Sequence, residues 1–360
     1  MSPETIAVFL PNWIGDAIMA TPAIRHLHET FPRARLVAVS RAYVAPIMHG
    51  SPWFSSMVLH DKTGKEGLRG AGVIRELRKL DIDVAILFPN SFRSAMMAWF
   101  GKCDRRIGFA RYARGCLLTD PLEPRRNPKG KIAPSPIVDE YNRLASRLTG
   151  DTPEYRMELF TEPEDDRAAS RVWTGLGLSS RPVIGLNPGG AFGASKHWPT
   201  GHFADLANRL IDAHDADILV LCGPKEREIA REIQQKAGRD EVKTLADADL
   251  SLGLLKGLIR RMNLLVTTDS GPRHIGAAFG LPVVSLFGPT HIEWTNTYYP
   301  REVHLSKKVP CGPCQLRACP LAAPRTHQCM NDLMPATVAA AVERLLAEFP
   351  LKTRGMRYAG

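Results

Sequence analysis

Short runs of β-branched and apolar residues alternate with segments of helical period along this chain, and this alternation most constrains its fold. In the first half, the strand-length runs lie at residues 5–10, 35–40 and 83–88. Between the last two, apolar side chains recur at helical spacing at Val73, Leu77 and Leu80. Because such alternation is typical of βαβ units with parallel strands, the first half is predicted to be a doubly wound α/β domain.

The same pattern restarts in the second half of the chain. Buried strands are predicted at residues 182–187, 217–222, 264–268 and 282–287. The helices between and after them are expected to begin near Thr200, Pro224, Ser251 and Gly271. A second α/β domain is therefore predicted to follow the first.

A chain of 360 residues is longer than one hydrophobic core usually supports. We predict an N-terminal domain over residues 1–165, a second domain over 166–334, and a C-terminal helix with a basic tail over 335–360. In α/β proteins ligands bind outside the carboxyl ends of the parallel strands. The predicted architecture is therefore two tandem Rossmann-like domains that face a central cleft.

The composition is that of an ordinary globular protein, with 44% hydrophobic and 23% charged residues, which excludes disordered and fibrous classes. The N-terminus lacks a basic stretch followed by an apolar one. No apolar run reaches the roughly 18 residues that span a bilayer. We therefore expect a cytoplasmic protein without a spanning helix.

Much of the formal net charge of +10 comes from one segment, residues 102–131. Its basic residues are Lys102, Arg105, Arg106, Arg111, Arg114, Arg125, Arg126, Lys129 and Lys131. Such an excess favours an anionic partner, which could be nucleic acid, acidic lipid or an acidic glycan. A solvated loop face is the alternative, and composition alone does not decide between the two.

A polar loop follows the first predicted strand. In it Asn12 and Trp13 precede Asp16, where a helix opens. A carboxylate at this position can accept a proton from an attacking hydroxyl, the step that an inverting sugar transfer needs. Taken alone, Asp16 is better interpreted as a residue that caps the helix.

A second polar loop follows the strand at residues 83–88. Asn90, Ser91 and Arg93 lie there at the start of another helix. They are predicted to face an acceptor across the cleft, because a guanidinium suits a bidentate contact with a carboxylate or phosphate. A capped helix with a solvated arginine is the alternative interpretation.

In the second domain, the loop at residues 187–199 carries Gly189, Gly190, Ser195 and Lys196. Its glycines permit close backbone approach to a phosphate, and Lys196 can neutralise charge on a diphosphate leaving group. The loop matches neither the P-loop nor the dinucleotide fingerprint. A flexible surface loop remains the alternative.

Two further loops are predicted to lie at the same edge of that sheet. Asp269, Ser270 and Gly271 stand where a strand ends and a helix begins, so backbone N–H groups can hold a diphosphate while Asp269 holds sugar hydroxyls. His274 is one turn into the helix and is a binding candidate only. Gly288 follows the next strand. The three loops together predict one nucleotide-sized site.

These motifs together resemble glycosyltransferase family nine, the bacterial heptosyltransferases of the lipopolysaccharide inner core. The residues that carry the resemblance lie at 13–16, 89–92, 196–199, 269–274 and 287–289. The Pro-Asn-Ser-Phe element at 89–92 is similar to that of the type II rather than the type I members. The resemblance implies a GT-B fold and inverting transfer, without a required cofactor, from ADP-heptose to the first heptose of Kdo-substituted lipid A.

The resemblance also implies roles for individual residues. Asp16 matches the general base, Lys196 the diphosphate-binding lysine and Asp269 the heptose-binding acid. The acceptor carries Kdo carboxylates and lipid A phosphates, which gives the basic segment, with Arg105 and Arg106, an anionic partner other than nucleic acid. Because that acceptor lies in the inner leaflet, peripheral contact with the inner membrane is expected.

One loop departs from the family pattern. Type I members carry hydroxyl side chains before the lysine, where this chain has Ala191 and Phe192. Phosphate contacts in this loop are therefore expected from backbone N–H groups and Ser195.

Four of the seven cysteines cluster near the C-terminus, at Cys311, Cys314, Cys319 and Cys329. Four thiolates within nineteen residues can close a tetrahedral zinc site of the structural kind, which has no open position. The spacing is not that of a standard zinc finger or ferredoxin. A structural zinc and four ordinary thiols are both retained as interpretations.

Two alternatives to the heptosyltransferase hypothesis remain open. The chain could be a family-nine enzyme for another acceptor position or another nucleotide sugar, because no single residue specifies the base or the sugar. It could also be a sugar-nucleotide or nucleic-acid binding module without catalysis. That second alternative leaves Asp16 and the pairing of two domains without a role.

Overall fold

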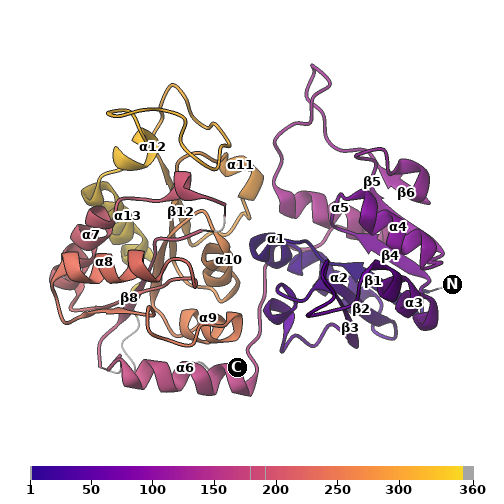
Figure 1. The fold of residues 1–360 in the computed structure, drawn as a ribbon, viewed down its shortest axis with the longest axis horizontal. Helices are drawn as coiled ribbons and strands as arrows, with labels where there is room; N and C mark the ends of the chain where they lie inside the picture. Colours follow the sequence, from indigo (N-terminus) through magenta and orange to yellow (C-terminus); the bar gives the residue numbers. More distant parts are fainter. Residues whose placement is uncertain (1, 179, 191, 352–360) are drawn as a thin grey trace. The chain divides into compact units, whose positions relative to one another are not determined.

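The computed structural model describes residues 2–178, 180–190 and 192–351, and the chain divides into two compact units (Figure 1). The first unit extends to Phe160 and also takes in the segment Glu293–Tyr298. The second comprises Thr161–Ile292 and continues from Tyr299. Ala191 and the basic tail from residue 352 lie outside the described residues.

The first unit is built on one six-stranded sheet in the order β3-β2-β1-β4-β5-β6, with every neighbouring pair parallel. The strands are β1 (Thr5–Phe9), β2 (Arg35–Arg41), β3 (Ser56–His60), β4 (Val84–Leu87), β5 (Arg105–Phe109) and β6 (Asp120–Leu122). β1 and β4 are buried along their whole length, as expected for parallel strands covered on both faces.

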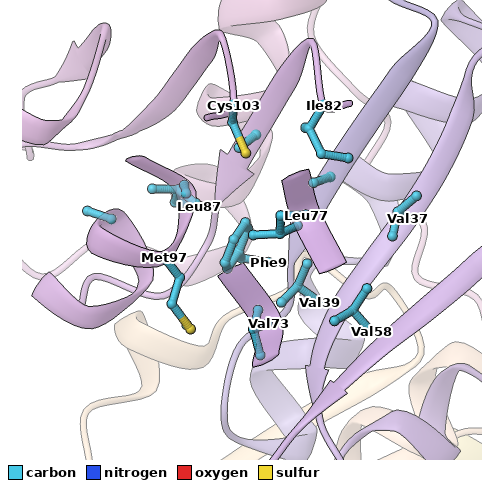
Figure 2. Close-up of a cluster of buried hydrophobic side chains, with 14 of the residues drawn as sticks. Phe9, Val37, Val39, Val58, Val73, Leu77, Ile82, Leu87, Met97 and Cys103 are labelled. Carbon is cyan, nitrogen blue, oxygen red and sulfur yellow. The ribbon is translucent and has the colours of Figure 1, made fainter. Parts of the chain in front are cut away.

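Five α-helices accompany this sheet: α1 (Ile14–Met19), α2 (Thr21–Thr30), α3 (Gly70–Leu80), α4 (Phe92–Phe100) and α5 (Ile137–Thr149). Val73 and Leu77 of α3 pack with Phe9 and Leu87 of the sheet and Met97 of α4 (Figure 2). Each of these side chains is at most 5% exposed. This core fixes the sheet whose loops carry the candidate residues.

The second unit repeats the architecture, with a parallel sheet in the order β12-β11-β10-β7-β8-β9. Its strands are β7 (Val183–Asn187), β8 (Asp217–Val220), β9 (Val242–Thr244), β10 (Leu264–Thr268), β11 (Val283–Phe287) and β12 (Glu302–Ser306). The predicted α/β class with two Rossmann-like sheets is thus confirmed.

The helices of the second unit are α6 (Pro163–Gly175), α7 (Thr200–His214), α8 (Arg227–Ala237), α9 (Leu252–Ile259), α10 (Gly271–Ala278), α12 (Gln328–Asn331) and α13 (Pro335–Glu348), whereas most of α11 (Ile292–Thr295) belongs to the first unit. α7 and α10 begin at the residues expected from the sequence, and Ser251 caps α9. α13 packs on α7 and on β11 and β12. Within the described ranges, no helix combines the length and apolarity needed to cross a bilayer.

The segment Glu293–Tyr298 departs from a simple split of the chain into two halves, since it packs with the first unit. The Tyr298 hydroxyl donates a hydrogen bond to Asp139 Oδ2 at 3.1 Å, and its ring meets that of Tyr155 edge-on. The boundary expected after residue 165 falls inside α6.

Candidate functional site

Both sheets follow the same winding rule, in which the strand order reverses beside the first strand of the unit. The reversal lies between β1 and β4 in the first unit and between β7 and β10 in the second. In doubly wound sheets ligands bind at this reversal, outside the carboxyl ends of the strands. The loops that leave these four strands are therefore expected to carry the site of each unit.

Asp16 lies in the first turn of α1, directly after the loop that leaves β1. Trp13 is the N-cap residue, with an extended backbone (φ −108°, ψ 140°), so Asp16 does not occupy the capping position. Burial, and then the negative charge of Asp16, raise the pKa of Tyr141 well above its ordinary value. The charge of the half-buried Asp16 carboxylate therefore acts on the Tyr141 phenol of α5.

The neighbouring residues of this loop are held by their surroundings. The side chain of Asn12 accepts a hydrogen bond from Arg41 Nε at 3.2 Å, and its carbonyl accepts one from the Tyr43 hydroxyl at 2.5 Å. Trp13 is 48% exposed, an unusual position for such a large apolar side chain. About half of the Trp13 side chain therefore stays exposed to solvent.

The loop after β4 is fixed by a buried arginine, Arg114. Ser91 caps α4 by accepting a hydrogen bond from the Ser94 backbone at 3.1 Å. The Arg114 guanidinium donates to Asn90 Oδ1 at 3.1 Å, to the Phe109 carbonyl at 2.9 Å and to the Pro89 carbonyl. Burial lowers the pKa of Arg114 to about 10. One cation thus orients the loop and the Asn90 amide.

Replacing Arg114 by Lys should lower the free energy of unfolding by about 2–4 kcal/mol, because an ammonium cannot reproduce the fork that reaches three acceptors. Denaturant unfolding measures this change. Arg126→Lys, at an exposed position of the same basic segment, serves as the control. A loss below about 1 kcal/mol in Arg114→Lys contradicts the assigned role.

The predicted acceptor residue Arg93 is exposed beside the carboxyl ends of β2 and β3. Burial, then the charges of Arg41 and Arg93, lower the pKa of His60 to about 4. Arg93 therefore belongs to a basic group at the same sheet edge as Asp16.

Arg105 and Arg106 lie elsewhere. They open β5, at the opposite edge of the sheet from the loops described above. Arg105 pairs with Asp120 (Nη2 to Oδ1, 2.9 Å), and the Arg106 guanidinium donates to the carbonyls of Leu117 and Cys103. Both arginine side chains are thus held by contacts within the first unit.

In the second unit, Lys196 and Asp269 form a buried ion pair that joins the loops after β7 and β10. Lys196 Nζ lies 2.6 Å from Asp269 Oδ2 and 2.6 Å from the Asp269 carbonyl oxygen. The two side chains are only 9% and 5% exposed. Thr290, after β11, donates its hydroxyl to the same Oδ2 at 2.8 Å. Two of the three donors of the ammonium are thus used within the second unit.

The charge state of Asp269 follows from its neighbours. Burial raises the pKa of this carboxyl, but the charges of Lys196 and Arg273 outweigh burial and lower the pKa to about 2. Arg273 Nη1 lies 3.4 Å from Asp269 Oδ1. Asp269 is therefore an anion that fixes the position of the Lys196 ammonium.

Arg273 is in turn anchored by Glu302 of β12. The two side chains meet through two N–O contacts of 2.6 and 3.2 Å, and His304 lies 3.2 Å from the same carboxylate. Arg273 is fully buried, so this pairing compensates a charge that would otherwise be costly. Lys196, Asp269, Arg273 and Glu302 thus form a chain of alternating charges that supports the loop of Asp269.

The N-terminus of α10 is tied to the β7 loop by Asn187. Its amide nitrogen donates to Ser270 Oγ at 2.9 Å, to Thr267 Oγ1 at 3.0 Å and to the Gly189 carbonyl at 3.1 Å. Ser270 is the N-cap of α10, and Gly271 is its first residue. The predicted convergence of these two loops is therefore present in the structure.

Glu226 occupies part of the proposed phosphate cradle. Its carboxylate accepts from the Gly190 N–H at 2.9 Å and from the Gly223 N–H at 2.8 Å. It also lies against Gly189 so closely that a Cβ there would collide with it. Gly189 thus leaves room for a carboxylate of the chain itself.

Three other predicted residues serve the packing of this unit. The Ser195 hydroxyl donates to the Leu316 carbonyl at 2.6 Å, and Gly288 packs against Cys329 and Met330. His274 is 3% exposed, and burial, then the charge of Arg273, lower its pKa to about 3. His274 is consequently a neutral imidazole inside the unit.

The four clustered cysteines are free thiols. Burial, then the charges of Cys311, Cys314 and Cys319, raise the pKa of Cys329, so the other three cysteines lie within electrostatic reach of it. Among the described residues, however, no group of three or more His, Cys, Asp or Glu side chains is arranged to hold a metal ion. As placed, the thiols do not form the predicted zinc site.

Sequence reasoning did not single out Arg114, Glu226 or the Arg273–Glu302 pair. Each acts through a partner far along the chain, such as Asn90 for Arg114 at a separation of 24 residues. The Phe192 ring lies 4.8 Å from Lys196 Nζ.

Residues 71–323 match the family model described as glycosyltransferase family 9 (heptosyltransferase). The lipooligosaccharide heptosyltransferase 2 of Campylobacter jejuni is 28% identical over 95% of this chain and 98% of its own length. The lipopolysaccharide heptosyltransferase 2 of Escherichia coli K12 is also 28% identical, over 95% of this chain and 99% of its own length.

The fold of this chain is also similar to that of solved glycosyltransferase structures. The structure of the E. coli ADP-heptose lipopolysaccharide heptosyltransferase II matches with a TM-score of 0.75 and 26% identity, over 96% of this chain and 99% of that one. A family 9 glycosyltransferase from Veillonella parvula has the same fold, with a TM-score of 0.78, 22% identity and coverage of 96% and 97%.

Proposed function

This chain belongs to glycosyltransferase family 9, and on that premise we propose that it transfers L-glycero-D-manno-heptose from ADP-heptose to the first heptose of a Kdo-lipid A inner core. The family membership confirms the predicted enzyme class, a glycosyltransferase of GT-B fold. The choice of donor and acceptor follows the relatives named heptosyltransferase 2, with which the chain aligns nearly end to end.

The observation that carries the proposal furthest is the buried Lys196–Asp269 pair at the sheet reversal of the second unit. A fixed ammonium beside the N-terminus of α10 provides positive charge where a diphosphate leaving group needs it. We assign the donor to this unit, with Lys196, Ser270 and Gly271 on the diphosphate and Asp269 holding the lysine and the sugar hydroxyls.

The acceptor is assigned to the first unit, with Asn12, Trp13, Asn90, Ser91 and Arg93 around it. In the reaction, Asp16 takes the proton of the acceptor hydroxyl, and that oxygen forms a bond to the anomeric carbon. The bond from the anomeric carbon to the diphosphate oxygen breaks, and ADP departs with the electron pair. Inversion at the anomeric carbon follows from attack opposite the leaving group, and no cofactor takes part.

The proposal is tested by incubating purified protein with ADP-heptose and a Kdo-lipid A acceptor that ends in one heptose. A product heavier by one heptose is expected. A panel of other nucleotide sugars and an acceptor without the first heptose test the family-nine alternatives. Faster transfer from another donor, or to the acceptor without heptose, overturns the assignment, and no transfer from any donor favours a binding module.

We further propose that the protein works in the cytoplasm on the inner-membrane surface, with α4 as its contact. Phe92, Trp99 and Phe100 on this helix are 44%, 47% and 41% exposed, although such side chains are usually buried. Arg93 and Lys102 are exposed beside them. Exposed aromatic rings flanked by cations are typical of helices that lie in an anionic lipid surface.

Exchanging both Trp99 and Phe100 for Ser should weaken binding to phosphatidylglycerol-containing vesicles about tenfold, because less apolar surface enters the interface. Co-sedimentation measures the bound fraction. Tyr112→Ser, which removes a 69% exposed aromatic ring outside α4, is the control and should bind as wild type. Unchanged binding of the double variant contradicts the assignment.

A structural metal at Cys311, Cys314, Cys319 and Cys329 also remains a proposal. The electrostatic proximity of the other three thiols to Cys329 supports it, although the thiols would have to close around the ion. Elemental analysis of purified protein for zinc and iron decides the matter, since the absence of either metal at stoichiometric amount ends the proposal.

A further inference from the structure

The five charged side chains described above for the donor site do not add up to a positive charge. Lys196 and Arg273 are the two cations, and they are paired with the carboxylates of Asp269 and Glu302. The carboxylate of Glu226 lies against the loop after β7 and is the third anion. Two cations thus face three anions before a ligand is bound. Because a diphosphate carries further negative charge, its binding calls for another cation.

Several hydrogen-bond donors of the loop after β7 are already used within the second unit. The N–H groups of residues 195–197 donate to backbone carbonyls at 3.0 to 3.2 Å, and the Gly190 N–H donates to Glu226 at 2.9 Å. The Ser195 hydroxyl donates to the Leu316 carbonyl at 2.6 Å. These donors, which the sequence led us to expect on a phosphate, are thus directed to acceptors of the chain itself.

The segment that carries the clustered cysteines, residues 311–329, is fastened to two loops of the donor site, and we call it the cysteine segment. The Gln315 N–H donates to the carbonyl of Pro289, in the loop after β11, at 2.8 Å. The Arg317 carbonyl accepts from the Ser195 N–H, in the loop after β7, at 3.2 Å. The backbone of Arg317 is thus held directly against the loop that carries Lys196.

The Arg317 guanidinium and the Lys196 ammonium lie near the same aromatic ring. The guanidinium carbon of Arg317 lies 5.8 Å from the centre of the Phe192 ring, and Lys196 Nζ lies 4.8 Å from it. At these distances the face of a ring attracts a cation and helps to fix its position. Lys196 is buried and paired with Asp269, whereas Arg317 is exposed. The ring thus positions a second cation near the lysine assigned to the diphosphate.

The attachment of the cysteine segment indicates which phosphate Arg317 meets. Asp269 is assigned to the sugar hydroxyls, and it accepts a hydrogen bond from the Thr290 hydroxyl at 2.8 Å. Pro289, whose carbonyl binds Gln315, directly precedes Thr290. The cysteine segment is therefore fastened at the sugar side of the donor site. The phosphate on that side is the one bonded to the sugar, which is the β-phosphate of a nucleoside diphosphate sugar.

We propose that Arg317 binds the β-phosphate of the nucleotide-sugar donor together with Lys196. A guanidinium forms two parallel hydrogen bonds with a phosphate, which adds orientation to charge. When the bond between the anomeric carbon and the β-phosphate oxygen breaks, Arg317 stabilises the negative charge that this oxygen gains. The inference rests on the proposed function, because it assumes a nucleotide-sugar donor in the second unit. It gives the cysteine segment a part in donor binding that does not depend on a metal.

Exchanging Arg317 for Gln should weaken ADP binding about 10–100-fold, because a charged donor to the phosphate is lost. Binding of AMP, which has no β-phosphate, should be nearly unchanged. Arg317→Lys should recover part of the ADP affinity, since it restores the charge without the fork. Arg325→Gln removes the same charge from another exposed position of the cysteine segment, and it should bind ADP as wild type. Calorimetric titration measures these affinities.

The Arg317→Gln variant should keep the cysteine segment in place. The backbone carbonyl of residue 317 accepts from Ser195 and lies so close to Gly193 that a Cβ there would collide with it, and any side chain at 317 leaves this carbonyl unchanged. The midpoint of denaturant unfolding should therefore match that of wild type. If AMP binding falls as much as ADP binding, the exchange disturbs the whole loop and the β-phosphate contact is excluded.

Transfer assays separate this inference from the proposed function. Arg317→Gln should lower kcat/KM for ADP-heptose by at least the same factor, because the charge on the leaving oxygen grows during the reaction, while the acceptor KM stays unchanged. Equal ADP binding by wild type and Arg317→Gln, or none by wild type, overturns the inference even when heptose transfer is observed. Arg317-dependent ADP binding without transfer from ADP-heptose would overturn the proposed function alone.

Discussion

Asp16→Asn is expected to lower turnover by about 10²–10⁴-fold while ADP-heptose binding is retained. The amide keeps the size of the side chain in the first turn of α1 but cannot take the proton of the acceptor hydroxyl. Donor binding should persist because the residues assigned to ADP-heptose all lie in the second unit. Initial rates at saturating acceptor, with calorimetric titration of ADP-heptose, measure the two quantities separately.

The loss must be distinguished from a defect in folding. Asp16 also interacts favourably with the dipole of α1, so its exchange should cost no more than about 1 kcal/mol of stability. Asp83→Asn is the matched control, because Asp83 accepts hydrogen bonds from the Glu4 and Thr5 backbone at the opposite edge of the same sheet. Full turnover in Asp16→Asn would exclude this residue as the base.

The fold class could be predicted because buried parallel strands are nearly continuous apolar runs. The runs at residues 5–10 and 264–268 correspond to β1 and β10. The predicted strands did not include β3, β5, β6, β9 or β12. Of these, β6 and β9 have three residues each and carry a charged side chain, Asp120 or Lys243. Their places at the outer edge of each sheet become visible only when the neighbouring strand is present to pair with them.

Some residues of the candidate site could likewise be predicted from the sequence, and others could not. Residues that directly follow a strand, such as Asp16 and Asp269, could be predicted because topology alone brings strand ends together. The residues that hold them in place could not be predicted, since Glu302 binds Arg273 from 29 residues away in the sequence. The return of Trp294 to the first unit depends on tertiary packing that no local pattern encodes.

The basic segment illustrates why charge density in the sequence is a poor guide to a binding surface. Arg105 and Arg111 are six residues apart, yet they lie at opposite edges of the sheet because β5 runs between them. Arg105 is paired with Asp120, whereas Arg111 contacts the hydroxyl and ring of Tyr112. Strand direction, rather than the number of cations, determines which of them can meet an acceptor.

Lys196→Met should lower the free energy of unfolding of the second unit by about 3 kcal/mol, because it leaves the buried Asp269 carboxylate without its closest cation. The same change should weaken ADP-heptose binding about 10–100-fold, since a charged donor to the diphosphate is lost. Denaturant unfolding and calorimetric titration measure the two effects. Methionine keeps the length and apolar stem of lysine, so the change isolates the charge.

Thr290→Val provides the matched control, because Thr290 donates a neutral hydrogen bond to the same Asp269 oxygen and its loss should cost about 1 kcal/mol. The pH dependence separates the two variants further. The pKa of Asp269 is lowered to about 2, so its stabilising contribution is present above the ordinary value of 3.8 and is lost as pH falls through 2. Lys196→Met should lose most of this acid-sensitive stability, whereas Thr290→Val should keep it. If Lys196→Met unfolds with the wild-type pH profile, the ion pair does not support the donor site.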